Sequence, residues 1–270
     1  MEEESNPKNG LKIFMEFLGT FILCGALNLS TFYYKSNDSA IQSMQPILVF
    51  LAFFTAITIT RNISGGHINP AVTVAIWISD SDEIRKKNGL LYLYYIISQI
   101  FGAIVACIFS YIFYNKNVLQ VSIKEGNTPI CGLIIEAVGS FFFIYLILCQ
   151  SNAKAKIQED QTISTFLITV ALFAGSGVAS NVSGGILNPA IGFSNIIIRL
   201  IAFKNTGDAK NIWIYILGPF IGGIVAALVY LYFFKTYFDE VLVSNDEIKE
   251  EFNKISNEEL IKSEERKSDM

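Results

Sequence analysis

The chain has 270 residues, of which 52% are hydrophobic and only 16% charged, and its formal net charge is −4. This composition is too apolar for a water-soluble domain of this length, so it predicts an integral membrane protein. No basic face suggests a nucleic-acid partner. One histidine and four cysteines without paired spacing argue against a metal site and against disulfides.

Six apolar stretches are long enough to cross a hydrocarbon core of about 30 Å, which takes about 20 helical residues. They are residues 12–34, 44–62, 90–114, 131–150, 162–180 and 212–234. The acidic start Met-Glu-Glu-Glu lacks the basic residues of a secretory signal, so the first stretch is interpreted as a retained span. Two shorter apolar runs, at 70–79 and 189–200, are too short to span the membrane.

A motif that occurs twice stands directly before these two short runs. It reads SGGHINPA at residues 64–71 and SGGILNPA at residues 183–190. Glycines permit a tight turn, asparagine is a favoured helix N-cap, and proline is favoured at the first helical position. Each copy therefore predicts a loop that turns straight into a short helix. The residues at the two predicted helix starts are Asn69, Pro70, Ala71, Asn188, Pro189 and Ala190.

The two halves of the chain align at an offset of about 120 residues. EFLGTF at 16–21 matches EAVGSF at 136–141, and GAIVA at 102–106 matches GGIVA at 222–226. Each half holds three spans, an odd number, so the second half must begin on the opposite side of the membrane. In inverted repeats the functional site lies near the midplane, at the interface between the repeats. We predict an all-α membrane protein with six transmembrane helices and two re-entrant half-helices in an inverted repeat.

The basic residues of the loops predict the orientation. Residues 85–87 and 154–156 carry lysine and arginine in loops on one side, which assigns that side and both termini to the cytoplasm. Lys204 and Lys210, on the opposite side, count against this assignment. The predicted parts are a cytoplasmic tail (1–11), the first repeat (12–115), an extracellular loop (116–130), the second repeat (131–234) and an acidic cytoplasmic tail (235–270).

Two half-helices that enter from opposite faces would present their positive dipole ends to the same point. Asn69 and Asn188 would then direct amide donors into a lumen. A water oxygen that accepts from both must turn its hydrogens outward, which breaks a proton-conducting chain, and positive helix ends repel cations. Backbone carbonyls of residues 64–68 and 183–187, which no helix pairs, would supply acceptors along the path. We expect neutral molecules to pass.

Over residues 12–234 the chain resembles the aquaporin family, the major intrinsic proteins. The resemblance rests on the run from His67 to Thr73, on the Glu16 and Glu136 segments, and on Pro219 followed by two glycines. It implies a homotetramer in the lipid bilayer with one pore per subunit and no cofactor. It also implies passive conduction of water or small uncharged solutes.

The chain departs from the family at the second motif, which normally continues Asn-Pro-Ala-Arg. Here Ile191 takes the place of the arginine that forms a selectivity filter. Family spacing assigns the other filter positions to Val49, Ser176 and Gly185. None of the four is large and polar, so we expect a wider and less polar filter than in a strict water channel. Arg199, about 15 Å beyond Pro189 along the helix, is expected at the outer surface.

Glu16 and Glu136 are ionisable groups within apolar spans, and such groups are functional candidates. Their equivalent positions favour a role in holding the two loops by accepting backbone N–H groups; the alternative is a proton relay. His67 either braces the first loop or titrates as a gate.

The leading interpretation is a passive channel, not an enzyme, for water and small neutral solutes such as glycerol, urea or ammonia, which excludes protons and ions. The alternatives are a proton-coupled secondary transporter that uses Glu16 and Glu136, or a poorly conducting tetrameric scaffold. The host membrane is the plasma membrane or that of an intracellular vesicle.

Overall fold

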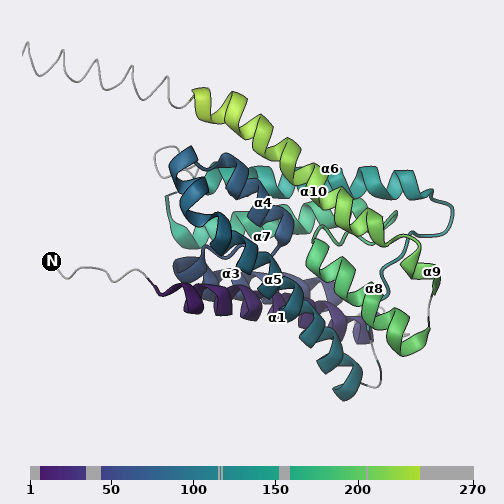
Figure 1. The fold of residues 1–270 in the computed structure, drawn as a ribbon. Helices are drawn as coiled ribbons and strands as arrows, with labels where there is room; N and C mark the ends of the chain where they lie inside the picture. Colours follow the sequence, from purple (N-terminus) through teal and green to yellow (C-terminus); the bar gives the residue numbers. More distant parts are fainter. Residues whose placement is uncertain are drawn as a thin grey trace, which may run out of the picture. The chain divides into compact units, whose positions relative to one another are not determined.

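The computed structural model describes residues 7–34, 44–114, 116, 118–151, 159–204 and 206–237, and every regular element in these ranges is helical (Figure 1). The long helices are α1 (Asn9–Tyr34), α3 (Met44–Ser64), α5 (Asp82–Phe113), α6 (Pro129–Ser151), α7 (Gln161–Ser180) and α10 (Ile212–Val229). The shorter ones are α4 (Pro70–Ser79), α8 (Pro189–Phe203) and α9 (Thr206–Ala209). Six helices in the described ranges are long and apolar enough to cross a membrane, which confirms the predicted fold.

The chain divides into two compact units after Leu228. In the second unit, Tyr230–Lys235 form a π-helix. Most of the predicted acidic tail, residues 238–270, lies outside the described residues, as do residues 1–6 of the predicted N-terminal tail.

Helix α5 begins at Asp82, whereas the hydropathy pattern placed the start of this span at residue 90. The side chain of Ser81 caps the helix by accepting from the backbone N–H of Ile84, and two acidic residues in the first turn favour a helix start. The basic residues 85–87 therefore lie on a helix and not in a loop. Arg85 also donates to the backbone carbonyls of Ile78 and Asp80, where α4 ends.

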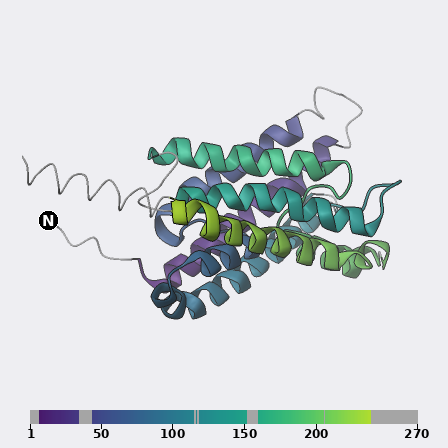
Figure 2. The same ribbon diagram turned by 90° about the horizontal axis from the view of Figure 1, so that it is seen from above.

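In the first unit the halves of the chain interlock. Helix α1 packs on α3 and α5, and α6 packs on α7. Helix α4 of the first half contacts α6 of the second, and α8 of the second half contacts α5 of the first. Figure 2 shows the long helices running alongside one another. The first four residues of each short helix, 70–73 and 189–192, are buried, so both N-termini lie in the interior of this unit.

Glycines bring the helices into close contact at equivalent places in the two halves. A side chain at Gly102 of α5 would collide with the carbonyl of Phe17 in α1, and one at Gly222 of α10 would collide with that of Ala137 in α6. Where α6 meets α7, a Cβ added to Gly139 would lie 2.8 Å from the carbonyl oxygen of Gly175. Small residues of this kind let helix backbones approach within a membrane.

We expect Gly222→Leu to lower the free energy of unfolding by about 1–3 kcal/mol, because the new side chain collides with the backbone of α6. Gly25→Ala in α1 is the matched control, since nothing lies within 4 Å of the added Cβ. Thermal unfolding of the detergent-solubilised protein measures the difference. Equal unfolding temperatures for the two variants would contradict the close packing of α6 and α10.

Candidate functional site

The two motif loops have matching backbones with an unusual conformation. Positive φ angles occur at Gly65 (98°), Gly66 (65°), Ile68 (40°), Gly184 (94°), Gly185 (65°) and Leu187 (51°). Glycine adopts these angles freely, but Ile68 and Leu187 carry side chains, and a left-handed conformation costs such residues about 1–3 kcal/mol. Interactions around the loops must offset this cost.

The carboxylate of Glu16 holds the first loop. Glu16 is fully buried in α1 and accepts from the hydroxyl of Ser64 at 2.6 Å and the backbone N–H of His67 at 3.0 Å. Its other oxygen accepts from the N–H of the left-handed Ile68 at 2.6 Å and from Nε2 of Gln99 at 2.7 Å. Both carboxylate oxygens are therefore occupied by protein donors.

The carboxylate of Glu136 holds the second loop in the same way. It accepts from the hydroxyl of Ser183 at 2.5 Å and from the backbone N–H of Ile186 at 3.0 Å. Its second oxygen accepts from the N–H of the left-handed Leu187 at 2.7 Å. Hydrogen bonds to a charged group are worth about 1.5–3 kcal/mol each, enough to offset the strain of the loop.

One tyrosine in each half, which sequence reasoning missed, completes the support of the loop in that half. The hydroxyl of Tyr95 donates to the carbonyl of Ser64 at 3.0 Å, and that of Tyr215 donates to the carbonyl of Ser183 at 2.7 Å. The two tyrosines stand 120 residues apart, the offset of the repeat. A search for identical residues at that offset would have found them.

Asn69 and Asn188 cap the two short helices. The side-chain oxygen of Asn69 accepts from the N–H of Ala71 at 2.8 Å, and that of Asn188 accepts from the N–H of Ala190 at 3.0 Å. In each helix a proline follows the cap directly. The loop-to-helix transitions that the motif predicts are therefore present in both halves.

The same two asparagines also join the loops to each other. Nδ2 of Asn69 donates to the carbonyl of Leu187 at 2.8 Å, and Nδ2 of Asn188 donates to the carbonyl of Ile68 at 2.9 Å. Each left-handed residue is thus held by its N–H within its own half and by its carbonyl from the other half. An amide nitrogen carries two hydrogens, so each asparagine keeps one for another acceptor.

Half of the loop carbonyls that we expect to supply acceptors along the path also have a partner within the protein. These five accept hydrogen bonds from side chains, which use one of the two lone pairs of each oxygen. They belong to Ser64, Ile68, Ser183, Gly185 and Leu187. Chain segments outside helices keep most of their polar groups paired when they are buried, and these loops follow that rule.

His67 belongs to a polar cluster beside the first loop. The hydroxyl of Thr73 donates to the carbonyl of Asn69 at 3.1 Å and accepts from Nε2 of Gln99 at 3.0 Å. Since that hydrogen is already used, Nδ1 of His67, 3.2 Å away, must be the donor to Thr73. This hydrogen bond ties the imidazole to the start of α4.

The second half lacks this cluster. The positions that correspond to His67, Thr73 and Gln99 are Ile186, Gly192 and Pro219. The two loops are thus alike in backbone and in carboxylate support but differ in the polarity of their surroundings.

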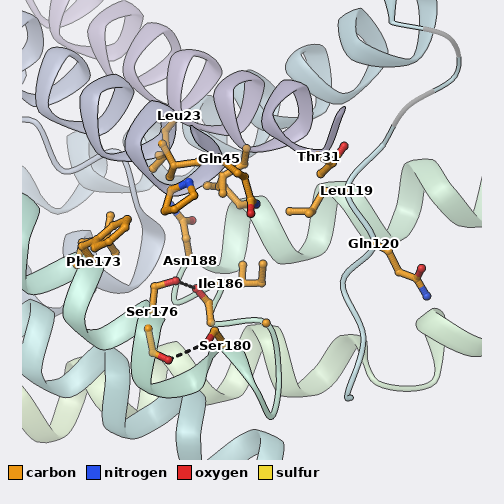
Figure 3. A pocket seen from close by; sticks show the side chains of 18 of the residues that line it. Leu23, Thr31, Gln45, Leu119, Gln120, Phe173, Ser176, Ser180, Ile186 and Asn188 are labelled. Atoms are coloured by element: carbon orange, nitrogen blue, oxygen red, sulfur yellow. Dashed lines mark hydrogen bonds between the residues drawn. The ribbon is translucent and has the colours of Figure 1, made fainter. Parts of the chain in front are cut away.

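A cavity of about 1010 Å³ reaches the loops from one end of the first unit. The four predicted filter residues Val49, Ser176, Gly185 and Ile191 all border it. Figure 3 shows side chains of α1 (Leu23), α7 (Phe173, Ser176) and the second loop (Asn188) around this space. The hydroxyl of Ser176 donates to the carbonyl of Gly185 at 2.6 Å, so these two filter positions are hydrogen-bonded to each other. Ile191 borders the cavity but has no exposed surface.

Arg199 also borders the cavity and is mostly buried, whereas we expected it at the outer surface. Its guanidinium donates to the carboxylate of Asp208 and to the carbonyl of Val118, both at 3.0 Å. These partners let a cation leave the surface, and the carboxylate neutralises its charge.

Comparison with known proteins agrees with this geometry. The family model described as major intrinsic protein matches residues 3–230. Aquaporin TIP2-3 of Arabidopsis thaliana is 31% identical over 84% of this chain and 89% of its own length. Aquaporin-4 of Mus musculus is 32% identical over 81% of this chain and 66% of its own length.

Among solved structures, the aquaglyceroporin from Plasmodium falciparum superposes with a TM-score of 0.74 at 20% identity. It covers 86% of this chain and 99% of its own. At 20% sequence identity, this similarity shows a shared fold alone. The matched family model and the relatives above 30% identity show that the chain belongs to the major intrinsic protein family, the aquaporins.

Proposed function

We propose that this integral membrane protein conducts water and small uncharged solutes passively, and that Asn69 and Asn188 form its barrier to ions. Membership of the aquaporin family supports a channel and not an enzyme. The observation that carries the proposal is the pair of crossed amide hydrogen bonds, which brings both helix N-termini to one point.

The mechanism follows from the groups at that point. Each asparagine has one amide hydrogen left after it has donated to the opposite loop. A passing water oxygen that accepts both hydrogens points its own hydrogens away from the centre, so a continuous hydrogen-bonded chain is interrupted. The positive ends of α4 and α8 add a field that repels hydronium and metal cations. Neutral molecules meet neither obstacle.

Glu16 and Glu136 act as loop supports in this proposal. All four carboxylate oxygens accept from donors fixed in the protein, which favours a structural role for the two carboxylates over a relay of protons. The hydrogen bond of His67 to Thr73 supports a bracing role for the imidazole. The proton-coupled transporter is therefore the less favoured alternative.

We further propose the oligomeric state, the topology and the host membrane that the sequence predicts. The protein assembles as a homotetramer with one pore per subunit, and both termini lie in the cytoplasm. Two repeats (12–115 and 131–234) are joined by the extracellular residues 116–130. Large apolar side chains on the outside of the helices, such as Phe142 at 61% exposure, support burial against lipid or a neighbouring subunit. The membrane is the plasma membrane or an intracellular vesicle membrane.

Stopped-flow light scattering on proteoliposomes tests the proposed function. A channel gives fast shrinkage in an osmotic gradient, with weak temperature dependence and no need for a proton gradient. Flux that requires a proton gradient would favour the coupled transporter. Shrinkage no faster than that of empty liposomes would favour a poorly conducting scaffold.

Restoring a cation at the filter should narrow the range of solutes. We expect Ile191→Arg to lower glycerol and urea permeability by about tenfold relative to water, a change of about 1.4 kcal/mol in barrier height. The guanidinium would fill part of a space bordered by apolar residues and by the paired Ser176 and Gly185. Ile191→Leu is the control, since it keeps size and polarity. If the glycerol-to-water and urea-to-water permeability ratios are equal in the two variants, residue 191 is not part of the filter.

A further inference from the structure

We propose that Phe53 and Phe143 form the constriction that limits the size of permeant solutes, at the level of the two asparagines and not at the filter positions. The inference rests on the proposed channel function and adds a specificity-determining pair to it. Neither residue belongs to the repeated motifs or to the four filter positions.

The first observation is where the large cavity ends. Among the described residues that line it, α1 contributes no residue before Leu23, α3 none after Phe53, and α7 none before Thr169. From α6 only Phe143 takes part. The same cavity reaches Asn69 and Asn188. The spanning helices thus stop contributing at about half their length, and the two phenylalanines lie at this closed end.

The second observation is the loss of exposed surface at this level. Asn69 and Asn188 are each 3% exposed, Phe53 is 3% exposed and Phe143 is 1% exposed. Nearer the open end, Phe173 borders the same cavity and is 40% exposed. The cavity is therefore narrow around the asparagines and the two rings, and it is more open beside Phe173.

The third observation is that the two rings brace each other. Their centroids are 5.9 Å apart with an interplanar angle of 63°, an edge-to-face contact between α3 and α6. Such pairs are favourable, so neither ring turns aside without losing the contact. One wall of the passage is then rigid and apolar, and the amide groups form another.

These walls act differently on water and on larger solutes. Water replaces its lost hydrogen bonds with the two free amide hydrogens and needs little width. A solute with a carbon skeleton must press past the aromatic pair at the point where the asparagines leave least room. Of the filter positions, Val49 and Ser176 border the cavity and are partly exposed, whereas Gly185 and Ile191 are buried.

Removing ring volume tests the inference. Phe53→Leu, Phe143→Leu and the double variant are reconstituted, and water, glycerol and urea permeabilities are measured by stopped-flow light scattering. We expect the glycerol-to-water ratio of the double variant to rise by about tenfold, which corresponds to about 1.4 kcal/mol of barrier. Phe142→Leu is the matched control, because this neighbouring ring is 61% exposed and does not line the cavity. Its ratio should equal that of the wild type.

A water-conducting double variant with an unchanged ratio would overturn the inference and leave the proposed function standing. A larger rise for Val49→Ala than for Phe143→Leu would also overturn it, by placing the constriction at the filter. A wild-type protein that conducts neither water nor solutes overturns the proposed function and with it this inference. Where the double variant does not fold, Phe53→Trp tests the opposite direction: added volume must lower the ratio, and an unchanged ratio overturns the inference.

Discussion

Glu136→Gln is expected to lower the unfolding temperature markedly and to reduce water permeability at least about tenfold. The carboxylate accepts from Ser183, Ile186 and Leu187, whereas a glutamine offers one oxygen and an NH₂ group that would face an N–H or O–H donor. Each hydrogen bond lost to the charged group removes about 1.5–3 kcal/mol. The left-handed Leu187 then loses the contact that holds it.

Thermal unfolding and stopped-flow light scattering on the same preparation separate the two roles considered for the buried carboxylates. A support role couples the loss of flux to a loss of stability at every pH. A proton relay predicts that the variant keeps its stability and loses only flux driven by a proton gradient. Glu83→Gln is the control, because Glu83 is exposed in the first turn of α5.

Asn188→Asp is expected to make the channel leak cations by at least about tenfold, in the range that helix-dipole interactions of up to about 2 kcal/mol allow. Aspartate has the shape of asparagine and still caps α8, but it has no hydrogen to give to Ile68. A negative charge would replace an amide donor where two positive helix ends meet. This one substitution therefore weakens both the pair of amide donors and the positive field of the helix ends.

Proton and potassium flux into proteoliposomes, followed with a pH-sensitive dye and by membrane potential, measures the leak. Asn62→Asp is the matched control, since Asn62 is exposed at the end of α3 and its side-chain oxygen already accepts from Gln161. An ion-tight Asn188→Asp channel that still conducts water would show that the barrier lies elsewhere.

Much of the fold was predictable because membrane spans need length and low polarity, and both are visible in the sequence. The half-helices were predictable because an asparagine followed by a proline carries its own start signal. The offset of the repeat also indicated that Glu16 and Glu136 stand beside equivalent loops. These features depend on local chemistry or on comparison of the chain with itself.

Other features depend on which helices meet, and the sequence does not state that. Tyr95 and Tyr215 lie in apolar spans where tyrosines are common, and their partners are loop carbonyls in another part of the chain. Phe53 and Phe143 are 90 residues apart in sequence and come together only when α3 faces α6. The pairing of Ser176 with Gly185 likewise follows from how the second loop folds back on α7.

The exchange of hydrogen bonds between the two loops has a consequence for biosynthesis. The first loop leaves the ribosome more than a hundred residues before the second, so the carbonyl of Ile68 lacks its partner, Asn188, throughout that interval. Neither half can complete its loop alone, and the passage comes into being only when the halves dock. A newly inserted first half therefore contains no finished conduit that could leak ions across the host membrane.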